Sequence, residues 1–145
     1  MQLASAVIPS DSAELARALA REGLPTDDLK EPARTFLRFG SQGVAVGFGG
    51  YEMHGTDALL RSIVVLPEHR GRGIGANIVA AVSEHAAQAG ARQLFLMTTT
   101  ARPFFERLGF AVCDRECAPP GILASREVAE LCPSSAVLMS RGVAD

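Results

Sequence analysis

Short blocks of hydrophobic residues, separated by polar residues, Gly and Pro, run along the whole chain and predict strands interspersed with helices. The loose alternation over residues 2–8 predicts a strand that ends at Pro9. Residues 10–24 begin with three capping candidates, carry apolar residues at helical spacing and reach a stop at Gly23. They predict a first helix, which is followed by an acidic turn over residues 25–32.

The centre of the chain predicts a hairpin, a buried strand and a long helix. Residues 34–39 and 43–53 are strand-like segments separated by a Gly-Ser-Gln-Gly turn. Residues 57–66 form an almost continuous apolar run that ends before Pro67, as expected for a central strand covered on both faces. The apolar side of residues 73–88 then predicts a helix that packs on the sheet.

The remaining segments continue to alternate between strand and helix. They predict strands over residues 92–100, 110–116 and 135–141, and short helices over residues 102–109 and 125–131. This alternation argues for one mixed α/β sheet. With 145 residues and no repeat or linker, the chain suits a single domain that spans residues 1–145.

The composition narrows the class of protein. Hydrophobic residues make up 48% and charged residues 21%, which is typical of a globular chain. The net charge of −2, without a cluster of Lys or Arg, argues against a nucleic-acid surface. No apolar run approaches the ~20 residues that span a bilayer, and the N-terminal segment lacks the pattern of a signal peptide. We therefore expect a cytoplasmic protein with no nucleic-acid or membrane partner.

A glycine-rich turn, PEHRGRGIGAN over residues 67–77, stands where the long helix is predicted to begin. Glycines remove the Cβ atoms that would hold a ligand away, and the first N–H groups of a helix have no intrahelical partner. The N–H groups from Arg72 to Ala76, together with the charges of Arg70 and Arg72, predict a site for phosphate. The alternative is a strand–turn–helix with surface arginines and no ligand.

Two familiar phosphate sites fit this stretch poorly. A P-loop needs a Lys followed by Ser or Thr after its glycines, and the single lysine, Lys30, lies far upstream. Gly71, Gly73 and Ala76 match the dinucleotide fingerprint, but the turn does not follow the first strand, and the strand after the helix carries no acid for the ribose.

A third kind of site is indicated by a family resemblance. The spacing Arg70-x-x-Gly73-x-Gly75, after a strand that ends in Val-Leu-Pro, resembles the acetyl-CoA motif of the GNAT N-acetyltransferase superfamily. TTTARPFFERLGF, residues 98–110, resembles its second cofactor segment. The resemblance covers nearly the whole chain and implies the GNAT fold of class α/β. In that fold a mixed, mostly antiparallel sheet is flanked by helices and splayed between its fourth and fifth strands.

A narrower resemblance concerns one branch of that superfamily. The stretches GLPTDDL, ALLRS, TTTARPFFERLGF and LCPSSAVLMS are similar to the GNAT proteins found in arsenic-resistance operons. This branch resemblance does not identify the acceptor.

The superfamily resemblance implies where acetyl-CoA, the co-substrate, binds. The pantetheine fills the gap in the sheet and pairs with the backbone of the fourth strand, and the Val65 N–H is the natural donor to the developing oxyanion. The residues implied to bind the cofactor are Ile63, Val64, Val65, Arg70, Gly71, Arg72, Gly73, Ile74, Gly75, Ala76, Thr98, Phe104 and Phe105.

The chain departs from the superfamily pattern where the leaving thiolate is protonated. Phe105 stands where many members carry a tyrosine, and Thr98 stands where others often have an asparagine. Either solvent protonates the thiolate, since a thiol of pKa ~8.5 is a fair leaving group, or the single tyrosine, Tyr51, supplies the proton. A protein that binds acetyl-CoA without catalysing transfer is the remaining alternative.

Three polar residues are candidates for handling the acceptor amine. Glu52, at the end of the glycine-rich third strand, is the candidate base, as carboxylates at that place are in related proteins, with His54 as an alternative. Arg61 lies inside an apolar run and needs a partner. It either clamps a carboxylate of the substrate, with Ser62 beside it, or pairs with Glu52.

The cysteines and histidines give no metal pattern, because neither HExxH nor paired CxxC occurs. Thiolates bind soft metalloids, so Cys113, Cys117 and Cys132 are candidates for a trivalent-arsenical site. The alternative is that they are small buried hydrophobic residues, as free cysteines usually are.

Together these observations predict an acetyl-CoA-dependent N-acetyltransferase acting by direct transfer on a small-molecule amine, such as an amino acid or an organoarsenical analogue of one. The competing hypotheses are a non-catalytic module that senses acetyl-CoA or arsenicals, and a nicotinamide dinucleotide binder. Dimers through an edge strand or the last strand are common among the proteins it resembles, and the sequence leaves the oligomeric state open.

Overall fold

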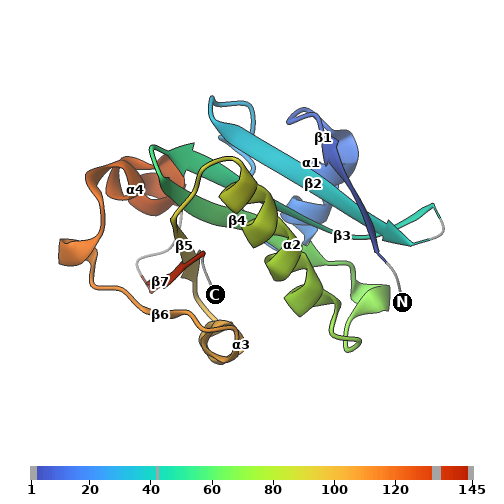
Figure 1. Cartoon of the computed structure of the whole chain (residues 1–145). Helices are drawn as coiled ribbons and strands as arrows, with labels where there is room; N and C mark the ends of the chain where they lie inside the picture. Colours follow the sequence, from blue (N-terminus) through green and yellow to red (C-terminus); the bar gives the residue numbers. More distant parts are fainter. Residues whose placement is uncertain (1–2, 42, 132–134, 144–145) are drawn as a thin grey trace.

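A seven-stranded mixed sheet forms the centre of the computed structural model, which describes residues 3–41, 43–131 and 135–143 (Figure 1). The strand order is β1-β2-β3-β4-β5-β7-β6, and every neighbouring pair is antiparallel except β4 and β5. The strands are β1 (Ala4–Ile8), β2 (Arg34–Ser41), β3 (Val44–His54), β4 (Asp57–Val65), β5 (Gln93–Thr98), β6 (Ala111–Val112) and β7 (Val137–Gly142).

Helices cover both faces of this sheet. They are α1 (Ala13–Arg21), α2 (Ile74–Gln88), α3 (Arg102–Arg107) and α4 (Pro120–Ala124), with short 3-10 turns η1 (Pro67–His69) and η2 (Arg115–Cys117) and a π-turn η3 (Glu127–Leu131). The helix predicted over residues 73–88 is confirmed, and Gly73 is its N-cap. Within the described ranges, no helix combines the length and apolar character needed to cross a bilayer.

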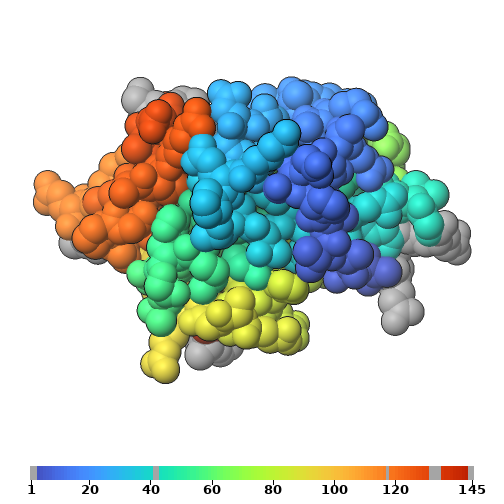
Figure 2. All heavy atoms as spheres, turned by 90° about the horizontal axis from the view of Figure 1, so that it is seen from above, coloured from blue at the N-terminus to red at the C-terminus, as the bar shows by residue number. Residues whose placement is uncertain are grey.

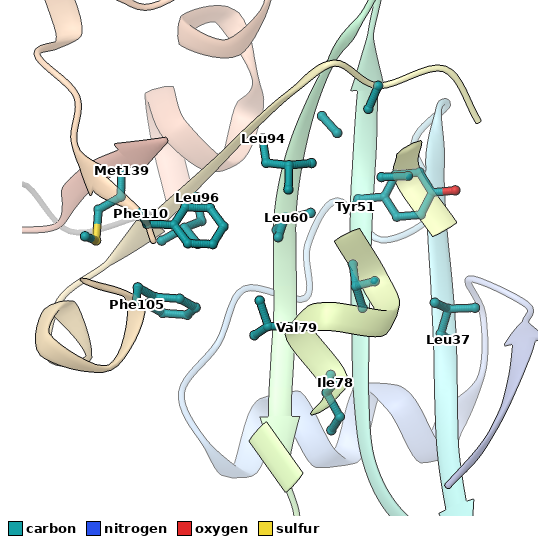
Figure 3. Packing of buried hydrophobic residues seen from close by; sticks show 14 of the residues in the cluster. Leu37, Tyr51, Leu60, Ile78, Val79, Leu94, Leu96, Phe105, Phe110 and Met139 are labelled. Carbon is teal, nitrogen blue, oxygen red and sulfur yellow. The ribbon is translucent and has the colours of Figure 1, made fainter. Parts of the chain in front are cut away.

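Alternation along the strands assigns side chains to the two faces of the sheet, where they form three hydrophobic clusters. The α2 face buries Tyr51 of β3 and Leu60 of β4 against Ile78 and its neighbours on the helix (Figure 3). The opposite face buries Phe36 and Phe48 against Leu15 and Leu19 of α1. Further along that face, Leu59 and Phe95 pack with Ile122 of α4 and Val128 of η3. In Figure 2, residues 25–41 lie between the orange segment of α4 and η3 and the blue N-terminal segment.

The sheet opens between β4 and β5, as the fold class predicts. Their parallel pairing covers only three residues of each strand and ends at Leu59 and Phe95. Beyond that point β4 contains a bulge, because Ser62 and Ile63 together face the single residue Gly49 on β3. Ser62 adopts a left-handed conformation with φ 58°. The bulge bends β4 away from β5, and a cleft takes the place of further pairing.

The C-terminal third differs from the prediction in three places. The strand expected over residues 110–116 is limited to Ala111–Val112, because Asp114 accepts a hydrogen bond from the Glu116 N–H and starts η2. The proline-containing loop forms α4, with Pro120 in the first turn, where a missing N–H costs no hydrogen bond. The helix expected over residues 125–131 is shorter and is the π-turn η3.

Candidate active site

A cleft of about 790 Å³ lies where β4 and β5 separate. Residues 60–65 of β4 form one wall, and residues 96–101 with Phe104 and Phe105 form the other. The glycine turn and the start of α2 close one end, and the loop over residues 22–25, Glu127 and Ala136 complete the lining. The structure therefore brings together most of the residues predicted to bind a cofactor, including Ile63, Val64 and Thr98.

The glycine turn has the backbone geometry that an anion site requires. Gly71 and Gly73 have φ of 83° and 75°, and a Cβ at either position would meet no protein atom within 4 Å. A Cβ on Gly75 would lie 3.3 Å from Cζ of Phe104. Ile74, Gly75 and Ala76 line the cleft, and their N–H groups are the unpaired first donors of α2. The turn and helix end thus present N–H donors and a positive dipole to the cleft.

The two arginines of the turn occupy different places. Arg70 lines the cleft, donates from Nε to the Val65 carbonyl at 2.9 Å, and pairs with Glu22 through Nη2 at 2.7 Å. Arg72 is exposed and is not among the cleft-lining residues. Of the two arginines, only Arg70 is therefore held at the cleft by protein contacts. Arg72 can contribute to the predicted phosphate site only through its backbone N–H and its solvent-exposed charge.

The Val65 N–H points to the cleft because strand residues alternate their hydrogen-bonding edges. The next residue, Leu66, donates its N–H to the Val46 carbonyl on the β3 side at 2.8 Å. Val65 therefore presents its own N–H and carbonyl to the opposite edge, where Arg70 meets the carbonyl. The Val65 N–H is therefore available on the cleft side of β4, and its role as an oxyanion donor stays a prediction.

The wall opposite β4 contains the residues that depart from the family pattern. Thr98 lines the cleft, and its Oγ1 accepts a hydrogen bond from the Ala101 N–H at 3.0 Å, just before α3. Phe105 is 8% exposed, lines the cleft, and packs edge-to-face with Phe104 and Phe110. The side chain at position 105 is therefore well placed to affect the cleft, but it has no proton to give.

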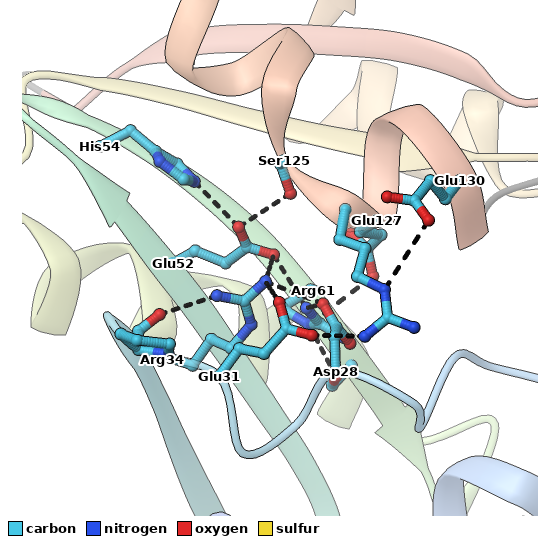
Figure 4. A network of polar contacts seen from close by, with 12 residues as sticks. Asp28, Glu31, Arg34, Glu52, His54, Arg61, Ser125, Glu127 and Glu130 are labelled. Atoms are coloured by element: carbon cyan, nitrogen blue, oxygen red, sulfur yellow. Dashed lines mark hydrogen bonds and ion pairs between the residues drawn. The ribbon is translucent and has the colours of Figure 1, made fainter.

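Glu52 belongs to a buried charge network rather than to the cleft wall (Figure 4). Its carboxylate is fully buried, and Oε2 accepts a hydrogen bond from Arg61 Nη1 at 2.8 Å. Oε1 accepts one from Ser125 Oγ at 2.8 Å and lies 2.9 Å from His54 Nε2. Both oxygens of the predicted base are thus engaged by protein groups.

Arg61 is likewise saturated by neighbouring carboxylates. Its Nη1 and Nη2 donate to the two oxygens of Asp28 at 2.6 Å each, and Nη1 also meets Glu52. Although burial opposes ionisation, hydrogen bonds from Arg61 and Arg34 hold the pKa of Asp28 below its usual value. Of the two interpretations of Arg61, the structure supports pairing with Glu52 and shows no free edge for a substrate carboxylate.

Glu127 is a cleft residue that sequence reasoning did not find. It is 5% exposed, begins η3, and lies with Oε1 3.6 Å from Arg61 Nε. No described residue donates a hydrogen bond to its carboxylate. Burial raises the pKa of Glu127 to about 7, and the nearby carboxylates of Glu52 and Asp28 add to the rise against the attraction of Arg61. In the sequence nothing distinguishes it from the exposed Glu130 of the same segment.

Tyr51 lies on the other side of the sheet from Glu52, since consecutive strand residues face opposite ways. Its hydroxyl is 2.6 Å from Nδ1 of His85 on α2, and it does not line the cleft. The structure therefore does not bring Tyr51 together with the residues predicted to bind acetyl-CoA, whereas Ser62 and Arg61 both line the cleft.

The cysteine hypothesis falls largely outside the part of the chain that the structure describes. Cys113 is a free, half-buried thiol whose Sγ lies 3.6 Å from the Asp114 carbonyl. Cys132 and the side chain of Cys117 are outside the described residues. Among residues 3–41, 43–131 and 135–143, no three His, Cys, Asp or Glu side chains are placed to hold one metal ion.

The mixed sheet that opens at this cleft gives the GNAT fold class, and comparison with known proteins identifies the family. Residues 32–112 match the family model described as an acetyltransferase (GNAT) domain. The match covers more than half of the chain, and the chain belongs to the GNAT acetyltransferase family.

A relative and two solved structures extend the comparison. Streptothricin acetyltransferase of Streptomyces lavendulae is 32% identical over 92 residues, which are 59% of this chain and 49% of that protein. The chain thus spans about half the length of this curated relative. N-acetylglutamate synthase from Neisseria gonorrhoeae, in complex with coenzyme A and N-acetyl-glutamate, superposes with a TM-score of 0.79 at 14% identity, over 100% of this chain and 36% of that one. A GNAT acetyltransferase from Staphylococcus aureus superposes with a TM-score of 0.72 at 16% identity, over 97% and 100% of the two chains.

Proposed function

We propose that this protein is an acetyl-CoA-dependent N-acetyltransferase that transfers an acetyl group directly to a small-molecule amine. The observation that carries the proposal is the cleft between β4 and β5, which ends at the N-terminal turn of α2. Membership of the GNAT family and the coenzyme A in the complex of N-acetylglutamate synthase from Neisseria gonorrhoeae support the choice of co-substrate.

The lining residues fit the parts of acetyl-CoA. The N–H groups at the start of α2 and the charge of Arg70 suit the pyrophosphate, and the missing Cβ atoms of Gly71 and Gly73 leave room for it. The free edge of β4 at Ile63 suits the amide groups of pantetheine, which would take the place of a neighbouring strand. The thioester carbonyl then meets the Val65 N–H, which stabilises the developing oxyanion.

Direct transfer requires little further chemistry from the cleft. The amine nitrogen forms a bond to the thioester carbon, and the C–S bond breaks with release of the thiolate. Because Phe105 has no hydroxyl, we assign protonation of the thiolate to solvent, as a thiol of pKa ~8.5 leaves readily. Tyr51 is not preferred as the acid, because its hydroxyl contacts His85 on the α2 face of the sheet and does not line the cleft.

Glu52 and Arg61 fit a positioning role better than the roles expected from the sequence. Glu52 accepts hydrogen bonds from Arg61 and Ser125, and Arg61 is clamped by Asp28. These contacts fix the inner end of β4 beside the cleft. Amino acids and organoarsenical analogues remain candidates for the acceptor. The guanidinium of Arg61 does not favour them, because Asp28 and Glu52 already occupy it.

One observation favours a second function. The absence of a tyrosine hydroxyl at Phe105 is compatible with a non-catalytic module that senses acetyl-CoA. Calorimetric titration with acetyl-CoA, and with NADH as the control, followed by an assay of thiol release against a panel of amines, distinguishes the two. Binding with turnover supports the enzyme, and binding without any turnover supports the sensor. Failure of the folded protein to bind acetyl-CoA contradicts both.

A further inference from the structure

The buried charges beside the cleft do not balance. Three carboxylates, of Asp28, Glu52 and Glu127, have side chains that are 0%, 0% and 7% exposed. Two guanidinium groups, of Arg61 and Arg34, face them at 0% and 7% exposure, while His54, at 25% exposure, contacts Oε1 of Glu52 and not Glu127. Burying an unpaired charge is costly, so this cluster favours one additional positive charge or one proton.

Only one of the three carboxylates is available to a ligand. Asp28 receives both terminal nitrogens of Arg61 and one of Arg34, and Glu52 has both oxygens engaged. Glu127 lines the cleft, receives no hydrogen bond from a described residue, and has Arg61 only at 3.6 Å. It begins the π-turn η3, a distortion that often marks functional sites. The missing positive charge of the cluster therefore belongs in the cleft, next to Glu127.

We propose that Glu127 binds the ammonium group of the acceptor and takes up its proton. The acceptors are then amines with no carboxylate beside the reacting nitrogen. This inference rests on the proposed transferase function. The proton balance is complete. The ammonium gives one proton to Glu127, and the freed amine attacks the thioester carbon. The second nitrogen proton leaves as the amide forms and reaches the departing thiolate through solvent, and Glu127 returns its proton to bulk water.

Among the residues that the structure describes, the cleft offers no cation free to bind a substrate carboxylate, and this sets the selectivity. The groups that face Glu127 are Arg61 of β4, Glu52 of β3, Asp28 of the loop before β2 and Arg34 of β2. Both arginines are held by Asp28 and Glu52. The other charged cleft residues, Arg70 and Glu22, pair with each other near the glycine turn. An amino acid bound through its ammonium group would place its carboxylate beside that of Glu127, with no cation to compensate the repulsion. The corresponding amide or decarboxylated amine carries no such negative charge.

The test compares amino acids with their amides, in the wild-type protein and two variants. Glu127→Gln removes the charge, and Glu130→Gln is the matched control because Glu130 lies in the same turn but is exposed. Acceptor turnover is followed by thiol release, and acceptor binding by calorimetry in the presence of saturating coenzyme A.

We expect wild type and Glu130→Gln to acetylate amides and simple amines much faster than the matching amino acids. Glu127→Gln should lose ~10²–10⁴-fold in kcat/KM, the usual effect of removing a proton acceptor, and should bind the acceptor more weakly while binding acetyl-CoA normally. The acid limb of the wild-type pH profile should disappear in this variant.

Two outcomes overturn the inference alone: equal or better use of the free amino acids, or turnover and acceptor binding that survive Glu127→Gln. If wild type binds acetyl-CoA but acetylates no amine of the panel, the proposed function itself is refuted, and this inference with it.

Discussion

Arg61 and Asp28 form a two-pronged ion pair, in which both terminal nitrogens of the guanidinium donate to the two carboxylate oxygens at 2.6 Å. The pair joins the acidic turn over residues 25–32 to the middle of β4, directly before the bulge at Ser62. A fork-to-fork pair of this kind is both strong and directional. It therefore fixes the position of the strand edge on which the proposed oxyanion donor lies.

Asp28→Ala should destabilise the protein strongly, because it leaves Arg61 buried without its main partner. Removing one member of a buried pair costs about 3–5 kcal/mol, which denaturant unfolding measures directly. Glu14→Ala is the control, since its ion pair with Arg38 at 2.9 Å has side chains 46% and 30% exposed. That pair is expected to contribute less than about 1 kcal/mol. Equal losses in the two variants would contradict the importance assigned to the buried pair.

Gly73→Ala should weaken acetyl-CoA binding more than it weakens the fold. A Cβ at this position would meet no protein atom, so it would intrude only on the ligand, and the positive φ adds a strain of about 1 kcal/mol. Gly55→Ala is the matched control, because Gly55 has φ 66°, equally open surroundings and a place in the β3–β4 turn. Both variants should lose similar thermal stability, and only Gly73→Ala should lose affinity in calorimetry.

The stability of wild type relative to Glu127→Gln should fall as pH rises. The folded pKa of Glu127 is about 7, raised from 4.5, so between these values the folded state holds a proton that the unfolded state has released. Stability is thus lost as pH rises through this window, on the order of 3 kcal/mol at a site this buried. Thermal unfolding of both proteins at pH 5 and pH 8 measures the difference.

The lowered pKa of Asp28 acts in the opposite direction and outside that window. Its contribution is present above the unfolded value of 3.8 and is lost only as pH falls through the lower folded value. The Asp28 contribution therefore does not affect the comparison of wild type with Glu127→Gln between pH 5 and pH 8. A constant difference in stability between these two proteins over that range would contradict the raised pKa of Glu127.

Phe105→Tyr tests whether a proton donor is missing from the cleft. The side chain lines the cleft at 8% exposure, so a hydroxyl there would point a proton donor toward the proposed thioester site. If solvent already protonates the thiolate, kcat should change by much less than the ~10²-fold typical of general acid catalysis. A gain of that size, measured by thiol release at pH 7, would instead identify protonation as the deficient step.

Tyr51→Phe tests the alternative acid. The variant loses the 2.6 Å contact to His85 on α2, and we expect a loss of about 1 kcal/mol in unfolding free energy from that hydrogen bond. Because Tyr51 does not line the cleft, kcat should be preserved within experimental error. A variant that folds normally but loses turnover would return Tyr51 to the catalytic site.

The sequence by itself determined most of the elements, the position of the glycine turn and the family resemblance. Hydrophobic periodicity is local, so residues 57–66 and 73–88 could be recognised as a buried strand and a helix without tertiary information. The turn could be found because its glycines serve a local backbone need, a positive φ at Gly71 and Gly73. The length of β6 was predicted less well and α4 was not predicted, because side-chain caps and tertiary packing decide where short elements begin and end.

Only the tertiary structure decided which charged residues face the cleft. Glu52 and Glu127 are 75 positions apart in a chain whose local patterns say nothing about which acid is enclosed by partners. Glu52 is enclosed because β3 brings it between Arg61 of β4 and Ser125, whereas Glu127 reaches the cleft because η3 packs near Leu59 and Arg61 of β4. The availability of a carboxylate depends on the sum of long-range contacts around it, and that sum exists only once the sheet has brought distant segments together.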